Sequence, residues 1–152
     1  MQTYIEQIQS YIESLPEERK ESYIKLYGIC NETLPTLGFT LCMQYKIPSR
    51  SISHKRYPDG YHCDPALPLP FLSLANQKWS INLYHMWIYA QPDLHEWFIN
   101  ERPHHSQRRI DMWKSCIRFK HMEHIPYDLI QELLTRMTAQ DRIQLYEQNI
   151  KK

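Results

Sequence analysis

The sequence predicts an α+β fold, with an N-terminal helical pair, an antiparallel sheet of about four to five strands, and C-terminal helices. Three observations support this prediction: helical spacing of apolar residues before Gly38, strict alternation after it, and a return to helical spacing after Pro126. The chain has 152 residues, which suits one hydrophobic core, so we expect residues 1–152 to form a single domain.

The helical pair is predicted by apolar residues that recur every three or four positions over residues 4–15 and again over residues 23–34. Between the two runs, residues 14–17 (Ser-Leu-Pro-Glu) have the form of a capping box with proline in the first turn. Pro35 and Gly38 are typical of a helix end, so the second helix should stop there.

Apolar and polar residues alternate from Phe39 to Ile47, which is the pattern of a half-buried strand, and Pro48 should end it. Residues 48–70 contain several prolines and an Asp-Gly turn, so we expect a long loop there. Loops of this length in compact domains often carry function.

Two strands, residues 71–75 and 79–86, are predicted to form a hairpin around a polar turn. In the second strand, alternation places Trp79 on the same face as Ile81, Leu83 and His85.

Pro92 is predicted to open a helix that Pro103 ends, and a short strand is expected over residues 116–120. Pro126 should open a further helix, and Thr138 should cap the last one.

Composition excludes two classes of nucleotide-binding loop. The chain has only three glycines, far apart, whereas the P-loop and the dinucleotide fingerprint need several within a few positions. The formal net charge is +1, so no overall field recruits nucleic acid, and we do not expect a nucleic-acid partner. The charge is uneven, because residues 1–38 hold six acidic and three basic side chains whereas residues 102–120 hold one acidic and six basic.

The four cysteines show no C-x-x-C spacing, and the chain begins with a polar amphipathic segment rather than a secretion signal. We therefore expect reduced thiols and a cytoplasmic location. No apolar run approaches the roughly 20 residues needed to cross a bilayer, so no membrane partner is expected.

Histidine and cysteine residues are the first candidates for chemistry, because both ligate metals and together they can build a nucleophile. The candidate metal ligands are His62, Cys63, His85 and Cys116, although their spacing resembles no zinc motif. Cys63 or Cys116 could serve a thiol-dependent enzyme, and the alternative is that these thiols are buried and inert. A candidate pocket adds further side chains to these four: Tyr45, Tyr61, Tyr84 and Lys114.

The basic segment 102–120 offers a second kind of site. Arg108, Arg109 and Arg118 are candidate anion ligands, and Trp113 could stack on a base; the alternative is a solvated basic loop. Strand parity also predicts an open polar sheet face, which could bind a ligand or a partner and which carries Cys42, Gln44, Lys46, Ser80, Asn82, Tyr84, Cys116, Arg118 and Lys120.

Several blocks of the chain resemble the YdhG-like family, bacterial domains of unknown function. The resemblance runs nearly end to end and is carried by residues 11–20, 57–65 (including Tyr61-His62-Cys63), 67–71, 83–86, 114–120 and 125–130. It implies a frataxin-like α+β fold, and one branch of the family is described as intracellular iron chaperones. Lys46 and Trp113 depart from the family pattern and add bulk at the edge of any shared pocket.

In frataxin-like proteins an acidic helical surface binds iron, which would correspond loosely to Glu6, Glu13, Glu17, Glu18 and Glu21. The resemblance thus implies a cytoplasmic, non-catalytic binding or carrier protein, with iron as a candidate cargo. The alternative is a module that binds an anionic ligand or a protein partner through residues 102–120, and a thiol-dependent enzyme comes third.

Overall fold

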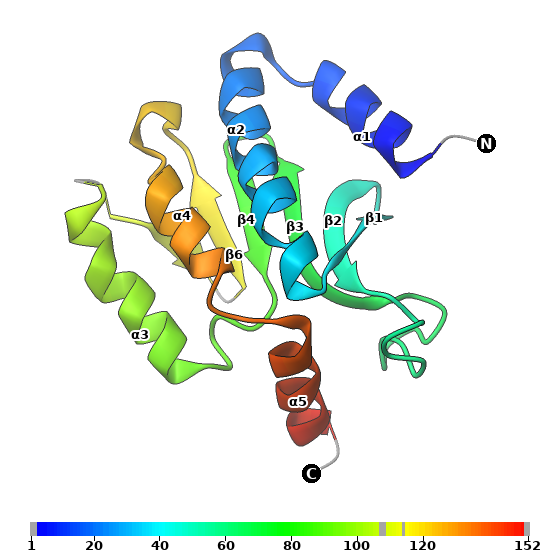
Figure 1. The fold of residues 1–152 in the computed structure, drawn as a ribbon. Helices are drawn as coiled ribbons and strands as arrows, with labels where there is room; N and C mark the ends of the chain where they lie inside the picture. Colours follow the sequence, from blue (N-terminus) through cyan, green and yellow to red (C-terminus); the bar gives the residue numbers. More distant parts are fainter. Residues whose placement is uncertain (1–2, 107–108, 114, 151–152) are drawn as a thin grey trace.

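The computed structural model describes residues 3–106, 109–113 and 115–150, and it has the α+β architecture that the sequence predicts. Two N-terminal helices precede an antiparallel sheet, and further helices follow it (Figure 1). The sheet has six strands, slightly more than the four to five predicted.

The six strands pair in the order β1-β2-β3-β4-β6-β5, and every pairing is antiparallel. Their bounds are β1 (Thr40–Gln44), β2 (Ile47–Ile52), β3 (Leu69–Asn76), β4 (Ile81–His85), β5 (Asp111–Trp113) and β6 (Cys116–Phe119).

The prediction that Pro48 ends the first strand and begins a loop is wrong, because Pro48 is the second residue of β2. The ladder between β2 and β3 begins one residue later, at Ser49 opposite Ser73. The missing N–H of Pro48 therefore leaves no gap in that ladder, which is how proline is tolerated near the start of a strand.

The described residues form five α-helices: α1 (Tyr4–Glu13), α2 (Glu17–Thr33), α3 (Pro92–Glu101), α4 (Tyr127–Leu134) and α5 (Ala139–Ile150). Three short 3-10 turns connect elements: η1 (Pro35–Leu37), η2 (Arg102–His104) and η3 (Met122–His124). In Figure 1, α2 and α4 lie across one face of the sheet, α3 lies beside α4, and α5 lies at the lower end.

Helix caps differ in part from the prediction. The predicted capping box at residues 14–17 does not form, because the Ser14 hydroxyl donates to the Tyr11 carbonyl at the end of α1 and α2 has no side-chain cap. The Thr138 cap is present: the Asp141 amide donates to the Thr138 hydroxyl over 3.1 Å, and the Thr138 amide donates to the Asp141 carboxylate.

The core lies between the helices and one sheet face. Phe39 and Phe71 stack with centroids 3.9 Å apart, and the buried Tyr23 hydroxyl donates to the Leu74 carbonyl over 2.6 Å. This bond ties α2 to the middle of β3. No helix among the described residues is long and apolar enough to cross a membrane.

The opposite sheet face carries the polar side chains that strand parity predicts, but much of it is not open. Ser49 and Ser51 are buried, and the Ser49 hydroxyl lies 2.8 Å from that of Ser73. Cys42 Sγ likewise lies 3.2 Å from the Ser51 hydroxyl. Small polar side chains on this part of the face therefore hydrogen-bond to one another.

The tight turn between β1 and β2 is strained. Tyr45 and Lys46 have φ angles of 54° and 64°, in the left-handed region that glycine and asparagine favour. Lys46 therefore belongs to the turn rather than to the polar sheet face.

Candidate functional site

A hollow of about 570 Å³ lies at the edge of the sheet beside β5, β6 and the start of α4. We call it the basic groove. It is lined by Ser106, Arg109, Ile110, Asp111, Met112, Arg118, Phe119, Lys120, His121, His124 and Pro126. Of the described residues in this lining, three carry a permanent positive charge and one a negative charge, so the groove is electropositive.

Strand pairing positions the charged side chains of the basic groove. Asp111 of β5 stands opposite Arg118 of β6, and Lys120 follows two residues later on the same side of the chain. The Asp111 carboxylate lies 3.4 Å from Arg118 Nη1 and 3.1 Å from Lys120 Nζ. One carboxylate thus orients two cations, and both cations remain partly exposed.

Two histidines complete the groove at η3. His121 and His124 lie 4.0 and 3.9 Å from the Glu123 carboxylate, and the Ser106 hydroxyl donates to the His124 carbonyl over 3.3 Å. That bond ties the segment after α3 to the wall of the groove.

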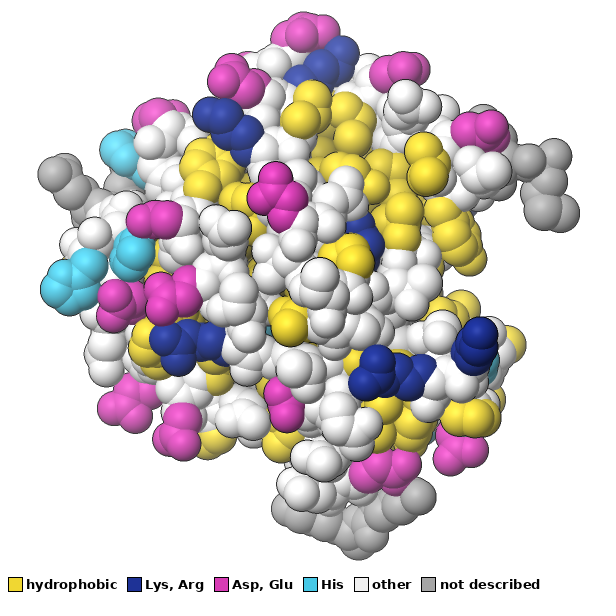
Figure 2. Space-filling view, viewed as in Figure 1, with side chains coloured by type: hydrophobic (Ala, Val, Ile, Leu, Met, Phe, Trp, Pro, Cys, Tyr) yellow, Lys and Arg dark blue, Asp and Glu magenta, His cyan; other side chains and the backbone are white. Residues whose placement is uncertain are grey.

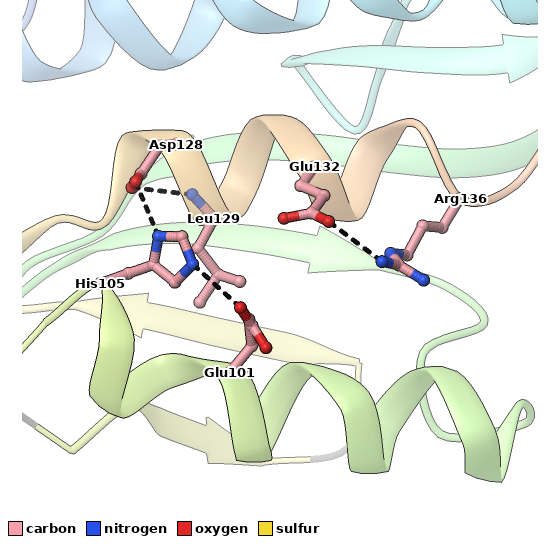
Figure 3. Close-up of polar contacts among 6 residues, drawn as sticks. All are labelled: Glu101, His105, Asp128, Leu129, Glu132 and Arg136. Carbon is pink, nitrogen blue, oxygen red and sulfur yellow. Dashed lines mark hydrogen bonds and ion pairs between the residues drawn. The ribbon is translucent and has the colours of Figure 1, made fainter.

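His105 anchors the same segment between α3 and α4 (Figure 3). Its Nδ1 lies 2.7 Å from the Asp128 carboxylate, and its Nε2 lies 3.5 Å from Glu101. The hydrogen bond to Asp128 raises the pKa of His105, and the same bond lowers the pKa of Asp128. His105 therefore has a structural partner on each side.

A second hollow, of about 510 Å³, lies over β4 and the turn that precedes it. We call it the tryptophan hollow. It shares Asp111, Arg118 and Lys120 with the basic groove and adds Gln77, Lys78, Trp79, Ser80, Asn82 and Tyr84. Within it the Ser80 hydroxyl donates to Asn82 Oδ1, and Asn82 Nδ2 donates to the Tyr84 hydroxyl.

Trp79 is the residue of this site that the sequence reasoning placed wrongly. It was predicted to share the inward face of a strand, but β4 begins at Ile81 and the indole is 73% exposed. The Gln77 amide donates to the Ser80 carbonyl over 2.8 Å, which closes a tight turn and directs Trp79 outward. Lys78 Nζ lies 5.1 Å from the centroid of its ring. The polar residues Gln77 and Lys78, just before Trp79, are the sequence feature that could have indicated a turn extending to Ser80.

The structure brings several predicted site residues to this end of the sheet. Arg109 and Arg118 line the basic groove, and Tyr84 lies opposite Cys116 in the β4–β6 ladder. Burial raises the pKa of the Cys116 thiol. Arg108 and Lys114 lie outside the described residues.

Tyr61, His62 and Cys63 lie in a different place, against α5. The Tyr146 hydroxyl accepts from the His62 amide over 2.7 Å and lies 2.5 Å from His62 Nδ1, while Cys63 Sγ lies 3.3 Å from His62 Nε2. A hydrogen bond to Cys63 raises the pKa of Tyr61 to about 12, and the exposed Tyr45 adds to this shift. The predicted pocket residues therefore fall into two separate groups.

Three buried or half-buried side chains lie behind these residues. Arg142 Nε and Nη2 donate to the Pro70 carbonyl over 3.1 and 2.7 Å, and its guanidinium lies 4.4 Å from the centroid of the Trp87 ring. His85 packs edge-on against Phe71, and burial lowers its pKa to about 4. We call residues 61–63, His85, Trp87, Arg142 and Tyr146 the loop cluster.

The four candidate metal ligands do not gather around one point. His62 and Cys63 contact each other, whereas His85 and Cys116 belong to opposite sheet faces, because Cys116 pairs with the neighbouring Tyr84. Across the described part of the chain, no three His, Cys, Asp or Glu side chains are grouped so that they could hold a metal ion.

Three acidic side chains of α1 and α2 have local partners. Glu6 caps α1 through Thr3, Glu17 lies 2.9 Å from Lys20, and Glu21 lies 3.6 Å from Lys25. On the face shown in Figure 2, acidic side chains are scattered over the surface rather than gathered in one patch.

Comparisons of the chain with protein-family models, curated proteins and solved structures find no match. The resemblance to the YdhG-like family therefore stays a prediction.

Proposed function

We propose that the protein is a binding module for a phosphorylated ligand, which it holds in the basic groove. The observation that carries this proposal is the convergence of Arg109, Arg118 and Lys120 on one hollow large enough for a small molecule. This is the anion-binding alternative that the basic segment 102–120 suggests.

The charges of the groove suit an oxyanion. Guanidinium and ammonium groups form their strongest hydrogen bonds with phosphate and carboxylate oxygens. Asp111 orients Arg118 and Lys120 without cancelling the local charge, because it is one carboxylate between two cations. A phosphate group would take the exposed side of the same cations.

The other two expectations have less support. The iron-carrier function rests on the family resemblance, the acidic helices and the four His and Cys candidates, which do not gather among the described residues. The thiol-enzyme function rests on Cys63, which contacts His62, or on the buried Cys116. A binding role without turnover needs only the cations of the groove.

Titration calorimetry with inorganic pyrophosphate tests the proposal. We expect saturable binding that weakens as the salt concentration rises from about 50 to 200 mM, because salt screens the attraction between the exposed cations and the phosphate. Arg118→Gln and Lys120→Gln should each weaken binding roughly tenfold, since each removes a charge-assisted hydrogen bond.

Lys55→Gln is the matched control, because Lys55 is an exposed lysine that does not line the groove. It should leave the affinity unchanged. The proposed function would be overturned if the protein did not bind pyrophosphate or if its affinity did not change with salt. It would also be overturned if Lys55→Gln weakened binding as much as Arg118→Gln and Lys120→Gln do.

A further inference from the structure

We propose that the ligand is a nucleotide, with its phosphate in the basic groove and its base on Trp79 in the tryptophan hollow. This inference rests on the anion-binding function proposed above and names the ligand class of that site. The two hollows share Asp111, Arg118 and Lys120 in their linings and so lie next to each other, which lets one molecule contact both.

The tryptophan hollow offers a flat apolar surface next to the cations. Trp79 is 73% exposed, and it lines the same hollow as Arg118 and Lys120. Stacking of an aromatic side chain on a nucleobase contributes favourably to binding, and every base has a π-face on which this can happen. A ligand with a charged end and a flat aromatic end fits this arrangement better than a simple phosphate does.

Polar groups beside Trp79 can meet the edge of a base. The hydrogen-bonded row Ser80–Asn82–Tyr84 forms the floor of the hollow, and the partly exposed Tyr84 stands at its end. Gln77, at the other side, is exposed and carries both a donor and an acceptor. A base stacked on Trp79 would therefore have the hydroxyl of Tyr84 and the amide of Gln77 in the same hollow as possible hydrogen-bond partners.

Phosphate recognition here depends on side chains. The sequence lacks the glycine-rich loops that let backbone amides surround a phosphate, and the groove presents Arg109, Arg118 and Lys120 instead. Arginine and lysine side chains bind phosphate without any such loop.

Calorimetry with three probes tests the inference: inorganic phosphate, ribose 5-phosphate and adenosine 5′-monophosphate. We expect the nucleotide to bind at least about tenfold more tightly than ribose 5-phosphate, because only the nucleotide can stack on Trp79. Trp79→Ala should abolish this difference and leave the affinity for ribose 5-phosphate unchanged.

Trp113→Ala is the matched control. Trp113 is 63% exposed and lies on the neighbouring β5, but it is not part of the lining of either hollow. It should keep the full preference for the nucleotide.

The outcomes separate the two proposals. Equal affinity for all three probes, or an equal loss in Trp79→Ala and Trp113→Ala, would overturn the nucleotide inference and leave anion binding intact. If none of the three probes bound, the proposed function and this inference would fall together.

Discussion

The basic groove and the loop cluster contain similar side chains in opposite situations. In the groove, Arg118 and Lys120 share one carboxylate and remain partly exposed. In the loop cluster, Arg142 is 1% exposed and donates to a backbone carbonyl between aromatic rings. The difference teaches that residue type alone does not mark a binding site. Arg142 already has a backbone carbonyl and two aromatic rings as partners, so its charge stabilises the fold.

The loop cluster also leaves hydrogen-bonding atoms unmatched. His85 Nε2, Trp87 Nε1 and Arg142 Nη1 are buried and have no partner within the described residues. Such atoms cost stability, and the aromatic faces around Arg142 offset part of that cost. The groove, by contrast, keeps its cations where water or a ligand can reach them.

The largest effect should come from replacing the buried arginine of the loop cluster, compared with replacing an arginine of the basic groove. Arg142→Ala should lower the free energy of unfolding by about 3 kcal/mol or more, because it removes two hydrogen bonds and the packing of the buried side chain. Arg118→Gln should change it by less than about 0.5 kcal/mol, since the Arg118–Asp111 pair is exposed. Urea denaturation measures the free energy of unfolding of both variants. Similar losses in the two variants would contradict the view that Arg142 stabilises the fold whereas Arg118 does not.

The second prediction concerns the pH dependence of folding. The pKa of His85 is about 4 in the folded protein and has an ordinary value of 6.5, because burial penalises the charged ring. Between these values only the unfolded chain binds the proton, so the free energy of unfolding falls as the pH drops from about 6.5 to 4. The loss is about 3 kcal/mol.

His85→Phe should remove most of this pH dependence, even if the substitution also changes stability at neutral pH. Urea denaturation at several pH values measures the free energy of unfolding of both proteins. An unchanged pH dependence in the variant would show that His85 titrates normally and that the loop cluster is more open than its burial indicates.

The sequence predicted the periodic elements and only part of the site. Helical and alternating spacing located α1, α2, β3 and β4, but β2 was missed because Pro48 and the polar residues after it resemble a loop. Arg109 and Arg118 were identified from charge alone. Lys120, placed on the polar sheet face, joins them through the pairing of β5 with β6, which local sequence does not show.

Arg142 shows why the buried contacts of the loop cluster could not be predicted from the sequence. It lies beside the apolar stripe of α5, where a charged residue normally marks the solvated face. It is buried because the Pro70 carbonyl and the rings of Trp87 and Tyr146 approach it from elsewhere in the chain. Contacts between distant segments of this kind leave no periodic signal.

The third prediction uses the four cysteines to test the outer rim of the loop cluster. Cys63 is exposed, whereas Cys30, Cys42 and Cys116 are buried and have raised pKa values, about 12 for Cys30. Cys63 should react with iodoacetamide at least about a hundredfold faster than the others, because a buried thiol must wait for local opening.

Mass spectrometry of the native protein measures this labelling site by site. Cys63→Ser should abolish the fast phase, and unfolding in urea should make all remaining thiols reactive. Comparable labelling of Cys116 in the native state would show that the sheet edge near the groove opens readily.

The fourth prediction concerns the β1–β2 turn, whose Tyr45 adds to the raised pKa of Tyr61 in the loop cluster. Lys46→Gly should raise the free energy of unfolding by about 1 kcal/mol, because glycine adopts a φ of 64° without strain. Lys55→Gly, at an exposed position without a positive φ, should instead lower it slightly. Equal effects of the two substitutions in urea denaturation would mean that the turn stores no strain.

The smallest effect concerns a structural histidine on the groove side. The pKa of His105 is raised above its ordinary 6.5 mainly by its hydrogen bond to Asp128, so the pair stabilises the fold fully below about pH 6.5. This contribution is lost as the pH rises through the raised pKa. It should amount to less than about 1 kcal/mol, because the Asp128 side chain is 73% exposed and solvent screens the pair.

The free energy of unfolding of the wild type and of His105→Gln, measured at about pH 6 and pH 9, isolates this contribution. Only the wild type should lose the stabilisation from the His105–Asp128 pair as the pH rises from about 6 to 9. Asp128→Asn should remove most of the same difference, because it removes the larger of the two carboxylate contributions that favour the protonated ring, while Glu101 remains. If both variants kept the wild-type pH dependence, the link between α3 and α4 in Figure 3 would be packing alone, and His105 would not anchor the wall of the groove through charge.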